Sequence, residues 1–270
     1  MVNKKKDFIA VIIIFTALLV FNKIYSQNNL FFEDNKKWGI VIQPIVYNKA
    51  FVSKDYGATV YDSQYSPSLK VGILYDFFQN RQLSIKSGLL TGLMPVINGK
   101  FKLLDSDIFF EDDFYFDESP IRSSLILSLP IQIEYKNFNY KNSIWNFGVG
   151  IQLNLIPESS IGEGVFLFDD VSGENREVYA SYADSNSSID VDLVFTYGIY
   201  FKIREMILNT SLLYHHSLKN KFEGEYQFGN LIESEPTRGE MNISGNYFGI
   251  SFTAYFKKKT KKKKRKNIKL

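Results

Sequence analysis

The most restrictive feature of this sequence is a period-two alternation of apolar and polar side chains that recurs in eight segments. Successive side chains of a β-strand face opposite sides, so this alternation marks strands that separate two environments. In the clearest segment, the odd-numbered positions from Ile189 to Phe201 are all apolar. The segments are 38–47, 69–77, 83–93, 122–136, 144–156, 189–202, 206–216 and 247–256. They predict an all-β fold.

The length of these segments indicates strands that cross a membrane. Most have 9–15 residues, whereas strands of soluble proteins usually have about 5–6 and a tilted membrane strand needs about 9–11. The body contains no apolar stretch long enough for a membrane helix. A protein that spans a bilayer without helices must form a closed barrel. The 24 Phe and 17 Tyr residues also favour strands.

The connections between the segments alternate in length. Short connections lie at 78–82, 137–143 and 203–205, and long ones lie at about 48–66, 94–121, 157–188 and 217–246. Outer-membrane barrels have short periplasmic turns on one rim and long extracellular loops on the other. The sequence therefore predicts an eight-stranded antiparallel up-and-down transmembrane β-barrel over residues 36–257.

The two ends of the chain differ from the body. Residues 1–26 have three lysines before an uncharged apolar stretch of 14 residues at 8–21, which predicts a secretory signal peptide. An uncleaved membrane anchor is the alternative, although a spanning helix needs about 20 apolar residues. Residues 258–270 form a basic C-terminal tail, which we expect to lie in the periplasm near anionic lipid or cell-wall polymer.

The net charge of +3 conceals an acidic body. Residues 1–26 sum to +3 and residues 257–270 to +10, which leaves −10 for the residues between. Overall charge therefore does not indicate a nucleic-acid binder. Two acidic blocks, at 105–118 and 158–184, fall in predicted loops. These blocks are either solvated loops or sites for divalent cations. A third alternative is a surface for a partner, because aromatic residues interleave with the acids of the first block.

The polar faces of the predicted strands contain four lysines and four carboxylates. These residues are Lys70, Asp76, Lys86, Glu134, Lys136, Asp190, Asp192 and Lys202. An eight-stranded barrel is just wide enough for its own side chains, and unpaired buried charges are costly. We therefore expect these eight residues to form a charge network in the lumen, and the lumen to be closed.

Few residues suit catalysis or metal binding. The absence of Cys excludes disulfides, thiolate metal sites and a thiol nucleophile. The two histidines, His215 and His216, are adjacent, so in a strand they face opposite ways. A metal site would need Glu223 or Glu225 as well, and a barrel enzyme would need a partner such as Ser217. We predict no enzyme activity, no cofactor and no metal.

One strand pattern resembles a known family. Leu129-Pro130-Ile131 followed by Tyr135-Lys136 resembles a strand of the Bacteroidota-type outer-membrane β-barrel family, which includes PorT-like proteins. The run 146–150, the strand at 191–202 and the aromatic strand at 248–256 fit that family in order. The resemblance covers about residues 36–257; the basic tail and the acidic loops depart from it. Its PorT branch implies a link to a secretion machine.

These observations together predict the protein's role. We expect a non-enzymatic integral outer-membrane barrel that acts through acidic and aromatic extracellular loops, or as part of an envelope or secretion-associated assembly. Its expected partners are outer-membrane lipid and other envelope proteins, with no nucleic acid. A small outer-membrane transporter or channel, or a barrel enzyme, is the alternative.

Overall fold

The computed structural model describes residues 30–57, 59–101, 121–137, 143–169, 174–186, 189–231 and 235–258. The predicted signal peptide, the basic tail beyond Lys258 and the acidic block at 105–118 lie outside these residues. The described part contains one short 3-10 helix, η1 (Leu30–Phe32). No helix in this part is long and apolar enough to cross a membrane.

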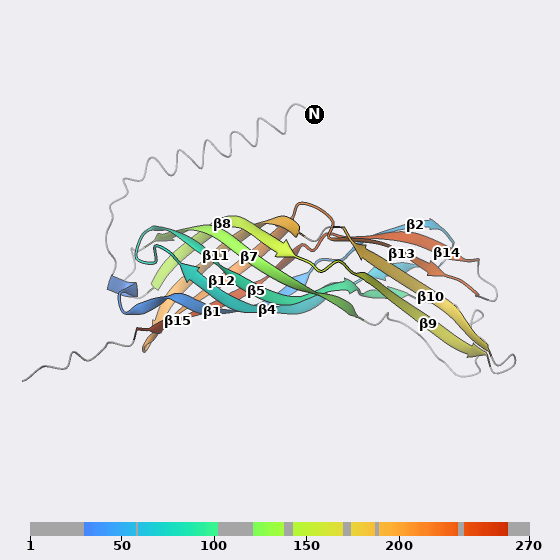
Figure 1. Ribbon diagram of the computed structural model, residues 1–270, viewed down its shortest axis with the longest axis horizontal. Coiled ribbons are helices and arrows are strands. Elements are labelled where there is room, and N and C mark those ends of the chain that lie inside the picture. Colours follow the sequence, from blue (N-terminus) through green and yellow to red (C-terminus); the bar gives the residue numbers. More distant parts are fainter. Residues whose placement is uncertain are drawn as a thin grey trace, which may run out of the picture.

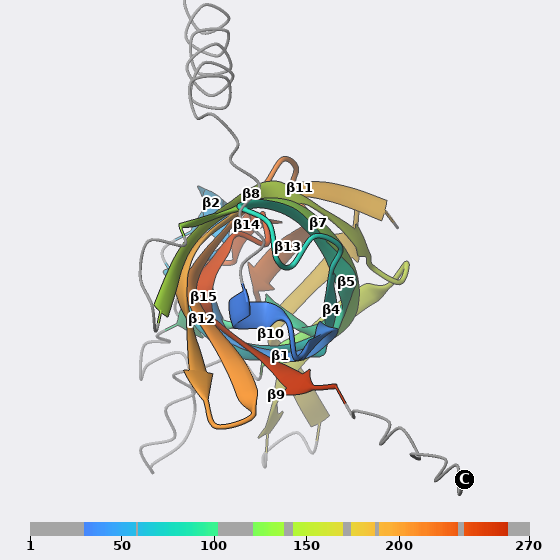
Figure 2. The same ribbon diagram turned by 90° about the vertical axis from the view of Figure 1, so that its left-hand side faces the viewer.

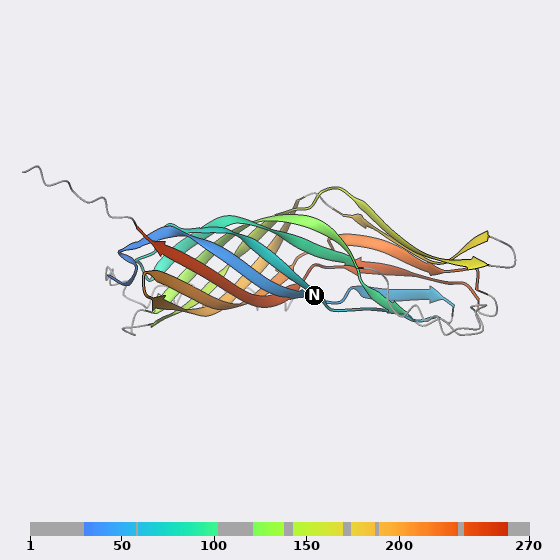
Figure 3. The same cartoon turned by 90° about the horizontal axis from the view of Figure 1, so that it is seen from below.

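The centre of the molecule is a closed barrel of eight antiparallel strands (Figures 1 and 3). The strands are β1 (Asn35–Tyr47), β4 (Ser66–Asp76), β5 (Leu83–Ile97), β7 (Arg122–Asn137), β8 (Ser143–Leu155), β11 (Ile189–Ile203), β12 (Met206–Ser217) and β15 (Tyr247–Lys257). Each strand pairs with its sequence neighbour in the barrel, and β1 closes the ring by pairing with β15. The predicted fold class is confirmed, and each alternating segment is a barrel strand.

The two rims of the barrel differ, as the alternating connection lengths predict. On one rim, which we call the turn side, β4 joins β5, β7 joins β8 and β11 joins β12 through short turns. Arg204, in the tightest turn, has a φ of 52°. The start of β1 and the end of β15 also lie on this rim, where Asn35 pairs with Lys257. We call the opposite rim the loop side.

The outer surface of the barrel is an apolar belt. Along β11, Val191, Phe195 and Tyr197 are exposed, whereas Asp192, Val194 and Tyr200 alternate with them and are buried. Exposed large apolar side chains likewise occupy the outward positions of β1, β4, β7 and β8. An apolar outside around a polar inside is the arrangement of a membrane-spanning barrel.

The long connections form a second β-sheet beyond the barrel, which the sequence analysis did not predict. Its five strands, in the order β2-β14-β13-β10-β9, extend from the loop side (Figure 1). They are β2 (Phe51–Tyr56), β9 (Ser160–Asp169), β10 (Glu174–Ser185), β13 (Phe222–Phe228) and β14 (Thr237–Ile243). Two short strands, β3 (Tyr61–Ser63) and β6 (Gly99–Phe101), pair with each other.

Stacked aromatic rings hold the short strands against the five-stranded sheet. The ring of Tyr61 lies 4.8 Å from that of Tyr226 and 5.9 Å from that of Tyr179, and Phe101 stacks on Tyr179 at 4.8 Å. Such pairs contribute about 0.5–1.5 kcal/mol each beyond the area that they bury. The loop side is therefore a folded layer with its own apolar core, to which the acidic block at 158–184 contributes β9 and β10.

Candidate functional site

The lumen of the barrel contains two separate clusters of charged residues. The cluster nearer the turn side joins four of the predicted residues. Lys86 contacts Glu134 at 2.5 Å, and Lys136 contacts Asp76 at 2.5 Å and Glu134 at 3.7 Å. Glu134 also accepts hydrogen bonds from Asn146 at 2.8 Å and from the Tyr200 hydroxyl at 2.6 Å, deep inside the barrel. This cluster is electrically balanced, with two cations and two anions.

The 3-10 helix η1 closes the turn-side opening below this cluster. Phe32 is completely buried, and its ring meets that of Tyr200 edge-on at 5.1 Å. The Lys136 ammonium lies 5.0 Å from the centre of the Phe32 ring on the lumen side. In Figure 2, which views the barrel from its turn side, η1 lies across the opening. The segment before β1 therefore plugs this end of the lumen.

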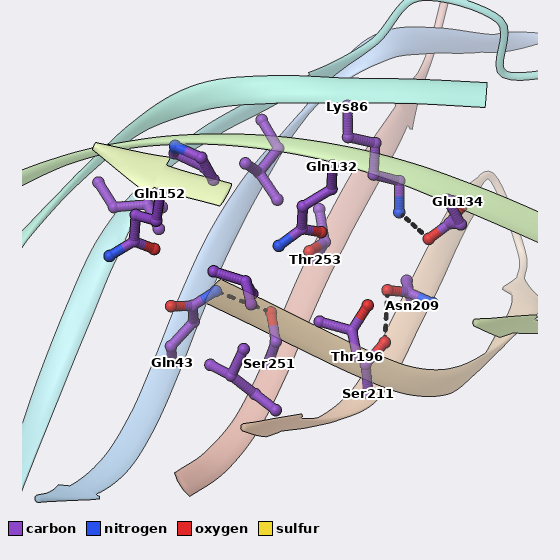
Figure 4. A pocket seen from close by; sticks show the side chains of 15 residues that line it. Gln43, Lys86, Gln132, Glu134, Gln152, Thr196, Asn209, Ser211, Ser251 and Thr253 are labelled. Atoms are coloured by element: carbon purple, nitrogen blue, oxygen red, sulfur yellow. Dashed lines mark hydrogen bonds and ion pairs between the residues drawn. The ribbon is translucent and has the colours of Figure 1, made fainter. Parts of the chain in front are cut away.

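The middle of the lumen is uncharged apart from its border with the turn-side cluster. Amide and hydroxyl side chains converge there around a cavity of about 20 Å³ (Figure 4), which is room for about one water molecule. Gln43 donates a hydrogen bond to Ser251 at 3.2 Å, and Ser211 donates one to Asn209 at 2.9 Å. Among the described residues, a cavity of this size is too small for a continuous column of water at this level.

The loop-side cluster is centred on Asp192. Its carboxylate accepts hydrogen bonds from Ser217 at 2.9 Å and from Asn154, and Lys221 approaches it to 2.8 Å. Lys221 also lies 3.7 Å from Asp190. His215 Nε2 is 3.4 Å from the Asp192 carboxylate. Lys221 belongs to the connection between β12 and β13, so a loop residue enters the barrel mouth and pairs with two barrel carboxylates.

The structure differs from the predicted network at two lysines. Lys202, which the alternation placed in the lumen, is exposed on the turn side and forms no ion pair with any described residue. Lys221 pairs with Asp190 and Asp192 instead. Lys70 is completely buried as expected, but it donates to the hydroxyls of Tyr247 at 3.1 Å and Ser128 at 3.5 Å rather than to a carboxylate. The other six predicted residues, Asp76, Lys86, Glu134, Lys136, Asp190 and Asp192, are buried in the two clusters.

Sequence reasoning missed Lys221 because it lies outside every alternating segment. The local sequence offers one weak signal for a buried position, which is that Lys221 directly precedes the apolar Phe222. The position depends on Gly245, whose φ is +76° and where an added Cβ would lie 2.6 Å from Lys221 Cδ. A side chain at this glycine would collide with the lysine stem that passes it.

An apolar cluster closes the loop-side opening above the charges. It combines barrel residues, such as Ile45, Met94 and Leu213, with Phe222 and Ile243 of the outer sheet. Because one buried core spans both layers, the sheet is packed directly onto the barrel mouth. The lumen is thus filled at both ends.

The outer face of the five-stranded sheet is acidic and open. Asp184 lies directly opposite Glu223, and Glu225 lies directly opposite Glu240. Like charges in these positions destabilise a sheet. Arg238 contacts Glu225, which raises the pKa of Arg238 through their hydrogen bond and opposite charges. These carboxylates border a shallow groove of about 300 Å³.

The histidines do not form a recognisable metal or catalytic site. His215 is buried and stacks on Tyr247 at 4.2 Å, whereas His216 is exposed on the outer surface. Glu223 and Glu225 point outward on the sheet. No group of three or more His, Asp or Glu side chains in the described ranges is arranged to hold a metal ion.

These observations define the class of protein: a membrane-spanning, closed eight-stranded β-barrel with a filled lumen. No protein-family model matches the chain, and no curated protein matches it either. Among solved structures, it is similar to the outer membrane protein OprG from Pseudomonas aeruginosa, with a TM-score of 0.41 and 10% identity over 83% of this chain and 98% of that chain. A likeness this distant adds nothing to what the barrel itself shows.

Proposed function

We propose that the protein is a non-enzymatic outer-membrane barrel that does not conduct solutes and acts through its loop-side sheet. The observation that carries this proposal is the filled lumen: two ion-paired clusters, an apolar seal and the Phe32 plug leave a cavity of only about 20 Å³ between them. A transporter of this size would need an aqueous path or a binding chamber.

The orientation follows from the two rims. A signal peptide at residues 1–26 would export the chain, and barrels in the outer membrane place short turns in the periplasm and long loops outside. The turn side then faces the periplasm and the five-stranded sheet faces the cell exterior. Four carboxylates on the outer face of that sheet suit a cationic surface of another envelope or extracellular molecule.

A role in an envelope assembly is the finer part of this proposal. The resemblance of the strand at 128–136 to PorT-like barrels supports an association with secretion components. The folded loop side supports it further, because an ordered sheet presents its side chains in fixed positions and loses little conformational entropy when it binds. A channel or a barrel enzyme finds no comparable support in the geometry.

The test combines fractionation with a comparison of surface variants. The mature protein should sediment with outer membranes and run faster on gels when unheated, because a hydrogen-bonded barrel resists detergent. Solubilised membranes should then yield envelope proteins that copurify with the native chain but not with a variant in which Asp184, Glu223, Glu225 and Glu240 are amides. Recovery in the soluble periplasm would refute the barrel location, and identical copurification with both chains would refute a role for the sheet face.

A further inference from the structure

The turn-side rim is strongly basic. Its exposed or half-exposed cations come from the start of β1, the β4–β5 turn, the end of β11 and the end of β15. They are Lys36, Lys37, Arg81, Lys202, Arg204, Lys257 and Lys258. The acids at the same level among the described residues are Glu33, Asp34 and Glu205. The described rim therefore has a net charge of +4, although the body of the chain is acidic.

Most of these cations lack a carboxylate partner. Lys257 pairs with Glu205 at 2.9 Å. By contrast, Lys37 donates to the Phe77 carbonyl at 3.1 Å and Lys258 to the Glu33 carbonyl at 2.7 Å, and a carbonyl does not neutralise an ammonium. The remaining four rim cations form no ion pair with a described residue. Several positive charges thus remain available to an external anion.

Aromatic rings fix the depth of this rim relative to the bilayer. The Lys36 ammonium lies 4.5 Å from the centre of the Trp38 ring, and the Arg81 guanidinium lies 5.3 Å from that of Phe78. Both rings are partly exposed: that of Trp38 on the outer face of β1, and that of Phe78 in the turn between β4 and β5. Aromatic girdles of membrane barrels sit at the lipid–water interface. The cations beside them therefore lie at the level of the lipid headgroups.

We propose that the turn-side rim is a binding surface for anionic phospholipid headgroups in the periplasmic leaflet. The inference rests on the proposed membrane location. Phosphate groups of such lipids would meet the unpaired ammonium and guanidinium groups around the barrel, and each lysine or arginine near an anionic surface adds to the attraction. A lipid is favoured over a cell-wall polymer because Lys36 flanks the outward-facing ring of Trp38 at the barrel wall.

The test measures which lipids remain bound to the folded barrel. The mature protein is inserted into vesicles with equal amounts of phosphatidylglycerol and phosphatidylethanolamine, extracted gently and analysed by native mass spectrometry. The rim variant carries Lys36→Gln, Lys37→Gln, Arg81→Gln, Lys202→Gln and Arg204→Asn; asparagine tolerates the positive φ at position 204. The matched control removes five loop-side cations through Lys49→Gln, Lys54→Gln, Lys100→Gln, Lys219→Gln and Arg238→Gln.

We expect the native chain and the control to retain phosphatidylglycerol preferentially. In the rim variant, the ratio of bound phosphatidylglycerol to bound phosphatidylethanolamine should fall about tenfold. Raised salt should weaken the preference, since exposed charges are screened. Equal retention by the rim variant and the control would overturn the inference. The inference would also be overturned if a chain that ends at Lys258 lost the preference for phosphatidylglycerol, because the basic tail would then be responsible for it. Insertion into neutral phosphatidylcholine vesicles is checked separately, and failure there would instead refute the membrane location.

Discussion

Replacement of Lys221 by methionine tests the least expected contact in the barrel. The Lys221 ammonium is almost completely buried and lies 2.8 Å from Asp192 and 3.7 Å from Asp190. Removal of one partner from a buried ion pair costs about 3–5 kcal/mol, because it leaves an uncompensated charge. Hydrogen bonds from Ser217 and Asn154 to Asp192 remain. We therefore expect a loss of about 3 kcal/mol in the free energy of unfolding.

The assay is urea unfolding of the barrel in lipid vesicles, followed by the fluorescence of Trp38 and Trp145. Both rings are partly exposed on the outside of the barrel, so their emission changes when the barrel leaves the lipid. The matched controls are Lys219→Met and Lys202→Met. Both lysines are exposed and form no ion pair with a described residue, so each should change stability by less than about 0.5 kcal/mol.

A double-mutant cycle isolates the pairing. Lys221→Met combined with Asp192→Asn removes both charges, and the combined loss should be smaller than the sum of the single losses by about 1–3 kcal/mol. Strict additivity would refute the ion pair. A large effect of Lys202→Met with none from Lys221→Met would restore the arrangement that the sequence alone predicts.

Three further changes probe the barrel wall, the plug and the loop-side contact in the same unfolding assay. Val191→Arg should cost about 2–4 kcal/mol near the bilayer midplane, whereas Val191→Leu, which keeps an apolar side chain toward the lipid, should change stability by less than about 0.5 kcal/mol; an arginine that is tolerated at Val191 would contradict the assignment of this residue to the lipid face. Phe32→Ala should cost about 3 kcal/mol through the cavity that it leaves, and an unchanged midpoint would show that η1 does not seal the barrel. Gly245→Ala should cost about 1–3 kcal/mol from backbone strain and collision with the lysine stem, whereas Gly229→Ala, which has open space, should not.

The sequence predicted the barrel well because a bilayer imposes a strict rule. Each outward position must be apolar, so β11 reads as an unbroken alternation from Ile189 onward, and strand length follows from bilayer thickness. The turn-side cluster could be predicted from the sequence for the same reason. Lys86, Glu134 and Lys136 all lie at inward positions of paired strands, so their proximity follows from register.

The remaining features depend on contacts that no periodic pattern encodes. The alternation along β11 assigns Lys202 to the inward face, but the residue lies where the strand reaches the turn-side rim, so it is exposed to solvent. Lys221 enters the lumen only because the connection after β12 folds back over the barrel mouth. In the outer sheet, β2, β13 and β14 have only 6–7 residues, and the sheet carries glycines and charges. It is stabilised by aromatic stacking between connections distant in sequence, such as Tyr61 on Tyr226.

The most direct test of the sealed lumen is single-channel recording of the purified, refolded protein in planar bilayers. With both charge clusters, the apolar seal and the η1 plug in place, we predict no steady conductance at moderate voltage and salt. Insertion is verified in parallel by the gel shift between unheated and heated samples. A stable, ion-selective conductance from the unmodified protein would contradict the account and would favour a transporter.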